Sequence, residues 1–188
     1  MKNSQETNQT FFKAGEKYGR ESLARLASKR SLERIEPGIY RKTDADFSEH
    51  ESLIVANLIA PKGVICLLSA LRFHDLTTQN PFDVWIAIGP HAHRPQAKSI
   101  SLRIVHFSGE SLTSGIEEHE IGGERIRVYD VAKTIADCFK FRNKIGLDVA
   151  LEALKEARQK NSFTMDELWK YAKICRVQNV IRPYLEAL

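Results

Sequence analysis

Hydrophobic positions near the start of the chain follow helical spacing and then strand spacing. Leu23, Leu26 and Ala27 fall on one face of a helix, and this spacing predicts a helix with a buried side and a wet side. Residues 32–35 and 39–41 then flank a Glu-Pro-Gly sequence, in which proline presets a turn and glycine supplies the backbone freedom that a reversal needs. The pattern predicts a helix followed by a tight hairpin, which is the order of a recognition helix and its wing.

Short runs of valine, isoleucine and aromatic residues indicate strands in the middle of the chain. The predicted strands are residues 82–88, 99–107, 116–121 and 125–129. Gly122 and Gly123 join the last two as a hairpin. We expect a mostly antiparallel sheet.

Helical signals lie on both sides of these strands. Residues 11–18 are predicted as a short helix, and residues 48–51 have capping-box spacing and open a helix that runs to about residue 60. Residues 64–74 are apolar almost throughout, so they fit a buried helix or a buried strand, although their length favours a helix. After the strands, Asp130 is the expected N-cap of one helix and Thr164 opens a second capping box.

Length and element order together predict an α+β protein. A chain of 188 residues suits one domain of ordinary size with a small appendage. We expect an abbreviated winged-helix-like unit over residues 1–43, and a larger mixed domain with an antiparallel sheet and C-terminal helices over residues 44–188. A complete winged helix has two helices before the recognition helix, and there is room here for barely one.

Positive charge gathers on the predicted helix and hairpin. Residues 1–42 contain ten Lys or Arg and five Glu, so this segment is +5 in a chain whose net charge is +4. Cations concentrated on one element are typical of a nucleic-acid surface, whereas an ordinary solvated helix is the plainer alternative. The predicted DNA-contacting residues are Arg20, Arg25, Lys29, Arg30, Arg34, Arg41 and Lys42.

Composition argues against several other classes. No apolar run approaches the length of a membrane span, and the first ten residues lack the apolar segment of a secretory signal, so we expect a cytoplasmic protein. Cys66, Cys138 and Cys175 are far apart among apolar neighbours, which favours buried thiols over a disulfide or zinc framework. His91 and His93 are two metal-type ligands without a third nearby, so no metal or other cofactor is expected.

Signals of catalysis are weak. The chain has no Walker spacing, no nucleophile elbow and no evident Cys-His pair, so we expect no enzymatic activity. Lys133, Thr134 and Asp137 lie at the start of a predicted helix, where an anion could dock, but a capped helix that closes on the sheet is the favoured interpretation.

Four segments in order resemble the AbiEi family of antitoxins from type IV, abortive-infection toxin–antitoxin systems. These are residues 26–41, 63–76, 84–88 and 128–137, of which the first is similar to the end of the family's recognition helix and its wing. The resemblance implies an antitoxin that represses its own operon by binding inverted repeats in promoter DNA. It also implies that the larger domain counters a nucleotidyltransferase-like toxin without needing a stable complex with it.

Two other functions stay open at this point. One is a small nucleic-acid-processing or nucleotide-binding enzyme with a site around Asp75, His91, His93 and Asp137, which would require these side chains to meet in one pocket. The other is an interaction module without DNA contact, which would require the cations between residues 20 and 42 to be paired with carboxylates.

Overall fold

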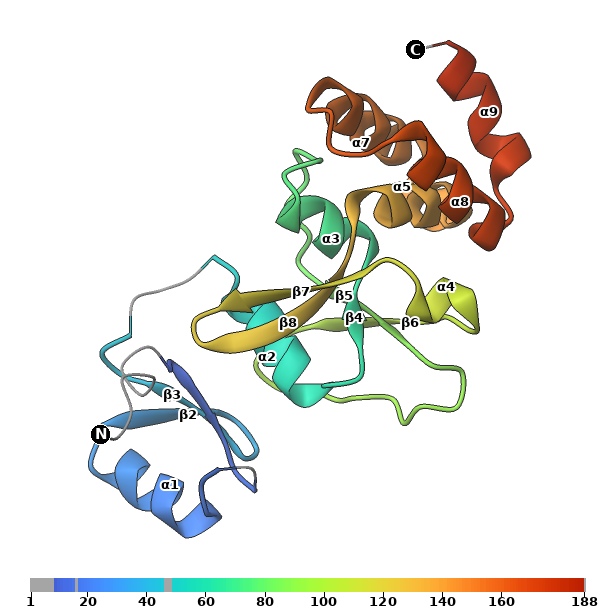
Figure 1. Ribbon diagram of the computed structural model, residues 1–188. Helices are drawn as coiled ribbons and strands as arrows, with labels where there is room; N and C mark the ends of the chain where they lie inside the picture. The colour runs from blue at the N-terminus through green and yellow to red at the C-terminus, as the bar shows by residue number, and fades with distance from the viewer. Residues whose placement is uncertain (1–8, 16, 46–48, 188) are drawn as a thin grey trace, which may run out of the picture.

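The computed structural model describes residues 9–15, 17–45 and 49–187. Two sheets with helices packed on them run along an elongated molecule, with the N-terminal sheet at one end and the C-terminal helices at the other (Figure 1). The fold is α+β, as expected from the sequence.

The N-terminal unit is a small three-stranded antiparallel sheet covered by one helix. Its strand order is β1-β3-β2, and its elements are β1 (Phe11–Lys13), α1 (Arg20–Ser28), β2 (Leu32–Glu36) and β3 (Ile39–Lys42). The predicted hairpin is confirmed: β2 pairs with β3, and the turn contains Gly38 with φ +81°. A positive φ at this position is the conformation for which glycine is needed.

The expectation of a helix over residues 11–18 is wrong. Phe11 to Lys13 form a strand that pairs with β3, with Phe12 opposite Tyr40. Successive side chains of a strand point to opposite faces, so Phe11 packs toward α2 while Phe12 packs toward α1. A long-range pairing therefore prevails over the local pattern.

The larger part of the chain is built on a five-stranded sheet with the order β6-β5-β4-β8-β7. Its strands are β4 (Val64–Ile65), β5 (Val84–Ile88), β6 (Leu102–His106), β7 (Ile116–Ile121) and β8 (Glu124–Tyr129). The β4–β5 and β7–β8 ladders are antiparallel, whereas β4–β8 and β5–β6 are parallel, so this sheet is mixed. The Gly122-Gly123 hairpin is formed as predicted, and its glycines have φ of +60° and +79°.

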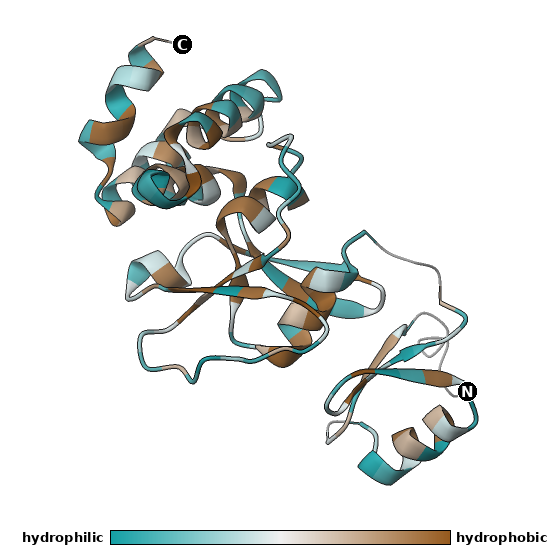
Figure 2. Ribbon diagram, turned by 180° about the vertical axis from the view of Figure 1, so that it is seen from behind, coloured by the Kyte–Doolittle hydropathy of each residue, from teal (hydrophilic) through white to brown (hydrophobic). Residues whose placement is uncertain are grey.

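Helices cover both faces of the five-stranded sheet, and the central strands are buried for that reason. One face carries α2 (Glu51–Ile59), and the other carries α3 (Leu67–Phe73) and α5 (Val131–Lys140). Every residue of β5 is buried, and Figure 2 shows α2 and the central strands as mostly hydrophobic. The short α4 (Glu110–Thr113) precedes β7.

Three further helices pack behind α5 at the C-terminal end. They are α7 (Leu147–Gln159), α8 (Met165–Cys175) and α9 (Gln178–Glu186), and the short α6 (Arg142–Ile145) precedes them. Two predicted caps are confirmed: Asp130 accepts a hydrogen bond from the backbone N–H of Lys133 at 2.7 Å, and Thr164 and Glu167 form a complete capping box. These caps fix where α5 and α8 begin.

Residues 48–74 differ from their predicted form. The helix that was expected to open with a capping box at Ser48 begins at Glu51 after His50, and Ser48 lies outside the described residues. The apolar run over residues 64–74 contains both a strand and a helix, β4 and α3, with Cys66 between them.

All three cysteines are buried. Across the described ranges, no helix has the length and apolar character needed to cross a membrane.

Candidate nucleic-acid interface

Helix α1 lies at the extremity of the molecule, on the side of the small sheet that faces away from α2 (Figure 1). Leu23, fully buried, anchors it against Leu32 and Tyr40 of the hairpin. Leu26 was expected on the same buried face, but 38% of its surface is exposed. Because the sheet has only three strands, it covers little of α1. Leu23 and Ala27 make the apolar contact with it, and Leu26 lies outside that contact.

Four of the predicted DNA-contacting cations lie on or directly after α1 and are exposed. These are Arg20, Arg25, Lys29 and Arg30. Within residues 9–15, 17–45 and 49–187, none of the four forms an ion pair with a carboxylate. Lys29 and Arg30 end the helix, and Arg30 adopts a left-handed φ of +58°. The end of α1 and the residues after it, with Arg25, Lys29 and Arg30, therefore carry positive charge without an ion-pair partner among the described residues, whereas Arg20 and Glu21, of opposite charge, lie at the start of the helix.

Arg41 has a different environment from the other predicted contacts. Its Nη1 lies 2.7 Å from Glu51 of α2, and its Nη2 lies 3.0 Å from Glu33 of β2. Burial lowers the pKa of Arg41, but hydrogen bonds and charge attraction from the two carboxylates outweigh burial and raise it. Arg41 thus joins the hairpin to α2 and is not an available phosphate contact.

Arg34 and Lys42 lie on the hairpin itself. The Nε of Arg34 donates to the backbone oxygen of Glu36 at 3.4 Å, and the rest of its side chain is exposed. Lys42 is half-buried, and its backbone N–H donates to the carbonyl of Thr10. Of the two, Arg34 keeps the more accessible charge.

The tip of the hairpin is attached to the larger part of the chain through Glu36. One carboxylate oxygen of Glu36 accepts hydrogen bonds from the backbone N–H groups of Lys98 and Ser99, and from the Ser99 hydroxyl at 2.7 Å. Burial raises the pKa of Glu36, but the hydrogen bonds from Ser99 and Lys98 outweigh burial and keep the pKa below its usual value. No local sequence pattern indicates this contact, because the residues that form it are more than sixty positions apart.

A buried ion pair lies in the interior of the larger part of the chain, and its burial was not predicted from the sequence. Lys133 and Asp137 of α5 are fully buried and form an ion pair one helical turn apart. The Lys133 Nζ lies 4.1 Å from the centre of the Tyr129 ring, and Asp137 Oδ1 accepts a hydrogen bond from Cys175 of α8 at 3.1 Å. Burial raises the pKa of Asp137, and the attraction of Lys133 offsets this only in part. The capped-helix interpretation of this segment is confirmed, because Asp130 caps α5 and the apolar face of the helix packs in the core.

The residues of the enzyme alternative do not meet in one place. Asp75, with 76% of its side chain exposed, lies in the turn after α3, while Asp137 lies inside the core. His91 and His93 lie in the exposed loop between β5 and β6. In the part of the chain that the structure describes, no three His, Cys, Asp or Glu side chains are arranged to hold a metal ion.

Comparison of the sequence with models of known families and with curated proteins finds no match.

Proposed function

We propose that this chain binds duplex DNA and that α1 enters the major groove. The observation that carries the proposal is the set of four exposed cations on and after α1 that have no carboxylate partner among the described residues. Cations without internal partners can bind DNA phosphates. Their binding releases the counterions condensed on the DNA, and this release is a main source of affinity.

The dimensions of α1 suit this role. An α-helix with its side chains is about 10–12 Å across, and the major groove is about 12 Å wide, so the nine-residue α1 can enter it. Arg25 and Lys29 are four positions apart and share a face of the helix. Leu26 beside them is partly exposed, and an apolar side chain there suits contact with a thymine methyl group.

The hairpin takes a smaller part than a free wing would. Arg41 is held by two carboxylates, and Glu36 ties the tip to the loop before β6. Arg34 and Lys42 remain as the hairpin's candidate phosphate contacts. The proposal therefore assigns most of the binding to α1.

On the resemblance to the AbiEi family, we further propose that the protein is the antitoxin and autorepressor of a type IV toxin–antitoxin operon. In this proposal the DNA is the operon's own promoter with inverted repeats, and the larger part of the chain opposes a nucleotidyltransferase-like toxin. The separation of α1 from the C-terminal helices supports a division between repression and antitoxicity (Figure 1).

A gel-shift titration tests the DNA contact. The probe is a duplex from directly upstream of the reading frame, and the protein carries Arg25→Ala, Lys29→Ala and Arg30→Ala together. If each cation neutralises one phosphate, the slope of log K against log salt falls by about 2.7, and affinity drops on specific and random duplexes alike. The matched control removes three exposed cations at the other end of the molecule, Lys155, Arg158 and Lys173. Unchanged affinity and slope in the α1 variant would refute the proposal.

Growth rescue tests the antitoxin role separately. The same α1 variant is expressed beside the nucleotidyltransferase-like product of the adjacent gene. We expect growth to be rescued as by the parent while promoter repression is lost. Failure of the parent protein to rescue growth would reject antitoxicity and leave the DNA-binding proposal untouched.

A further inference from the structure

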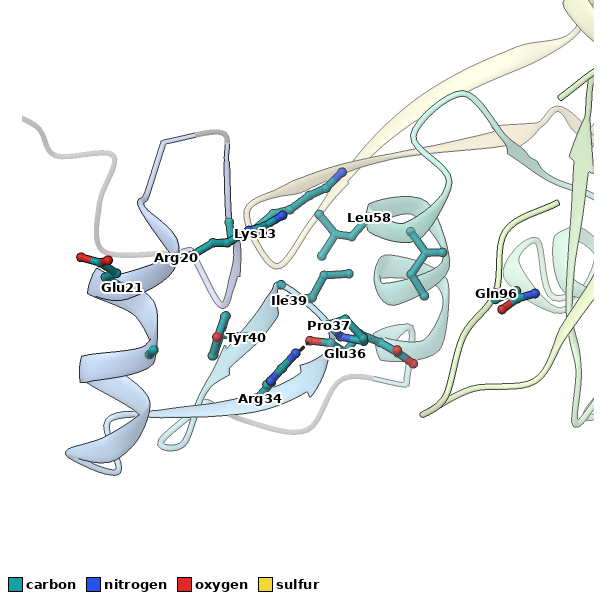
Figure 3. A pocket seen from close by; sticks show the side chains of 14 residues that line it. Lys13, Arg20, Glu21, Arg34, Glu36, Pro37, Ile39, Tyr40, Leu58 and Gln96 are labelled. Carbon is teal, nitrogen blue, oxygen red and sulfur yellow. Dashed lines mark hydrogen bonds between the residues drawn. The ribbon is translucent and has the colours of Figure 1, made fainter. Parts of the chain in front are cut away.

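A cavity of about 670 Å³ lies between the N-terminal unit and α2 (Figure 3). Its walls come from β1, the start of α1, the β2–β3 hairpin, the end of α2 and the loop that carries Gln96. The cavity is therefore assembled by two parts of the molecule that are separate in sequence, and a ligand within it would contact both.

Three cations from three different elements line this cavity: Lys13, Arg20 and Arg34. In Figure 3, Lys13 and Arg20 extend toward the side where Leu58 lies, and Arg34 lies at the opposite edge. Arg20 and Arg34 form no ion pair within the described ranges, although Arg34 donates one hydrogen bond to a backbone oxygen. Their guanidinium groups can thus bind a carboxylate, phosphate or sulfonate.

The two carboxylates of the lining form no ion pair with Arg20 or Arg34 among the described residues. Glu36 points toward the loop that carries Gln96, where Lys98 and Ser99 occupy it. Glu21 lies on the far side of α1 and points away from the cavity (Figure 3). The positive charge is therefore directed at the cavity, while the negative charge is either engaged or turned outward.

The remaining wall is apolar. Leu58 and Ile59 of α2 face Ile39 across the cavity, and Pro37 closes one side. Tyr40 stands among them with only 7% of its surface exposed, and its hydroxyl makes no hydrogen bond to the residues that the structure describes. The hydroxyl is open to solvent, so it can donate a hydrogen bond to a ligand in place of water.

We infer that this cavity binds a small organic anion with an apolar body. The aliphatic wall and Tyr40 would hold the body, while Arg34 would hold the anionic group and Arg20, at the opposite edge, would add positive potential. The inference does not depend on DNA binding or antitoxicity, since it uses only the lining of the cavity.

The probe for this site is 8-anilinonaphthalene-1-sulfonate, an aromatic sulfonate whose fluorescence rises in apolar surroundings. N-phenyl-1-naphthylamine, which has the same rings without the sulfonate, is the neutral control. With the full-length folded protein we expect one bound sulfonate per chain and binding of the neutral compound at least about tenfold weaker, because a charge-assisted hydrogen bond typically contributes that factor.

Variants of the lining locate the binding. Arg34→Gln should weaken sulfonate binding about tenfold or more and leave the neutral compound unaffected. Ala24→Phe, which adds bulk at the exposed mouth of the cavity, should weaken both compounds. Arg158→Gln on α7 removes the same charge far from the cavity and should change neither.

Circular dichroism and the urea midpoint establish that each variant is folded. Equal affinity for the two compounds, or parent-like binding in the folded Arg34→Gln and Ala24→Phe variants, would overturn the inference. If Arg34→Gln does not fold, the Ala24→Phe result and the comparison of the two compounds still decide it.

Discussion

Helices α1 and α5 each carry a cation one helical turn from a second charged residue. The cation of α1 is exposed to solvent, whereas that of α5 is buried in the core. Arg25 of α1 and Lys29, which caps its C-terminus, are exposed and have no ion-pair partner among the described residues. Lys133 of α5 is fully buried against Tyr129 and paired with Asp137. The difference arises because α1 is covered on one side by a small sheet, whereas α5 lies between the larger sheet and α8.

The comparison separates charges that can bind a partner from charges that hold the fold. A cation at the surface can exchange water for a phosphate at little cost to stability, whereas a buried cation depends on its internal partner. Variants of the buried pair, of Glu36 and of the α1 cations test this distinction.

The largest effect is expected at Asp137. Asp137→Ala removes the partner of Lys133 and leaves an uncompensated charge in the core, so the free energy of unfolding should fall by about 3–5 kcal/mol. Urea unfolding measures this change. The double variant Lys133→Met, Asp137→Leu replaces the pair with apolar side chains and should recover most of the loss. A loss below about 1 kcal/mol in Asp137→Ala would contradict the structural role of the pair.

A medium effect is expected at Glu36, where a charge attaches the hairpin to the larger part of the chain. Glu36→Gln should cost about 1–3 kcal/mol, because an amide oxygen is a weaker acceptor for the three donors from Lys98 and Ser99. The matched control is Glu120→Gln, because Glu120 of β7 is exposed and forms no ion pair within the described ranges.

The same position predicts a pH dependence. The pKa of Glu36 is lower in the folded protein than its ordinary value of 4.5, so the unfolded chain binds more protons in this window. The contribution of Glu36 to stability is therefore complete above pH 4.5 and is lost as the pH falls through the folded pKa. The difference in unfolding free energy between parent and Glu36→Gln should be constant from neutral pH to about pH 5 and shrink below pH 4.5. A difference that grows on acidification would refute this.

A smaller effect is expected in the hairpin turn. Gly38 has φ +81°, and a β-carbon there would meet only Ala14 at an ordinary 3.7 Å, so the cost of a substitution is backbone strain. Gly38→Val should lower the unfolding free energy by about 1 kcal/mol or more, and Gly38→Asn should cost less, because asparagine tolerates the left-handed region. Equal stability of the two variants would argue against strain at this turn.

The smallest effect on stability is expected on α1. Replacing Arg25, Lys29 and Arg30 with alanine should change the unfolding free energy by no more than about 0.5 kcal/mol, although the same variant should lose DNA affinity. Thermal or urea unfolding of the variant used in the gel shift checks this. A large loss of stability would mean that these cations support the fold as Lys133 does.

Local features of the fold followed from the sequence. The Pro-Gly and Gly-Gly turns, the Asp130 cap and the Thr164 capping box each depend on residues that are a few positions apart, so their hydrogen bonds are encoded locally. The exposed cations of α1 followed from the same local pattern. The sequence by itself also indicated an α+β chain with a helix and hairpin before a larger sheet.

Tertiary structure alone decided which charged and apolar residues are enclosed. Phe11 became part of a strand because β3 offered it a partner, Arg41 became occupied because α2 brought Glu51 to it, and Glu36 became buried because the loop before β6 covered it. Lys133 and Asp137 have the spacing of an ordinary surface pair, and the packing of α5 between the larger sheet and α8 makes them interior. Burial depends on segments that come from far along the chain, whereas helix, turn and cap signals depend on immediate neighbours. For this reason the sequence by itself determined the turns and caps, while the tertiary structure decided which charged side chains remain exposed.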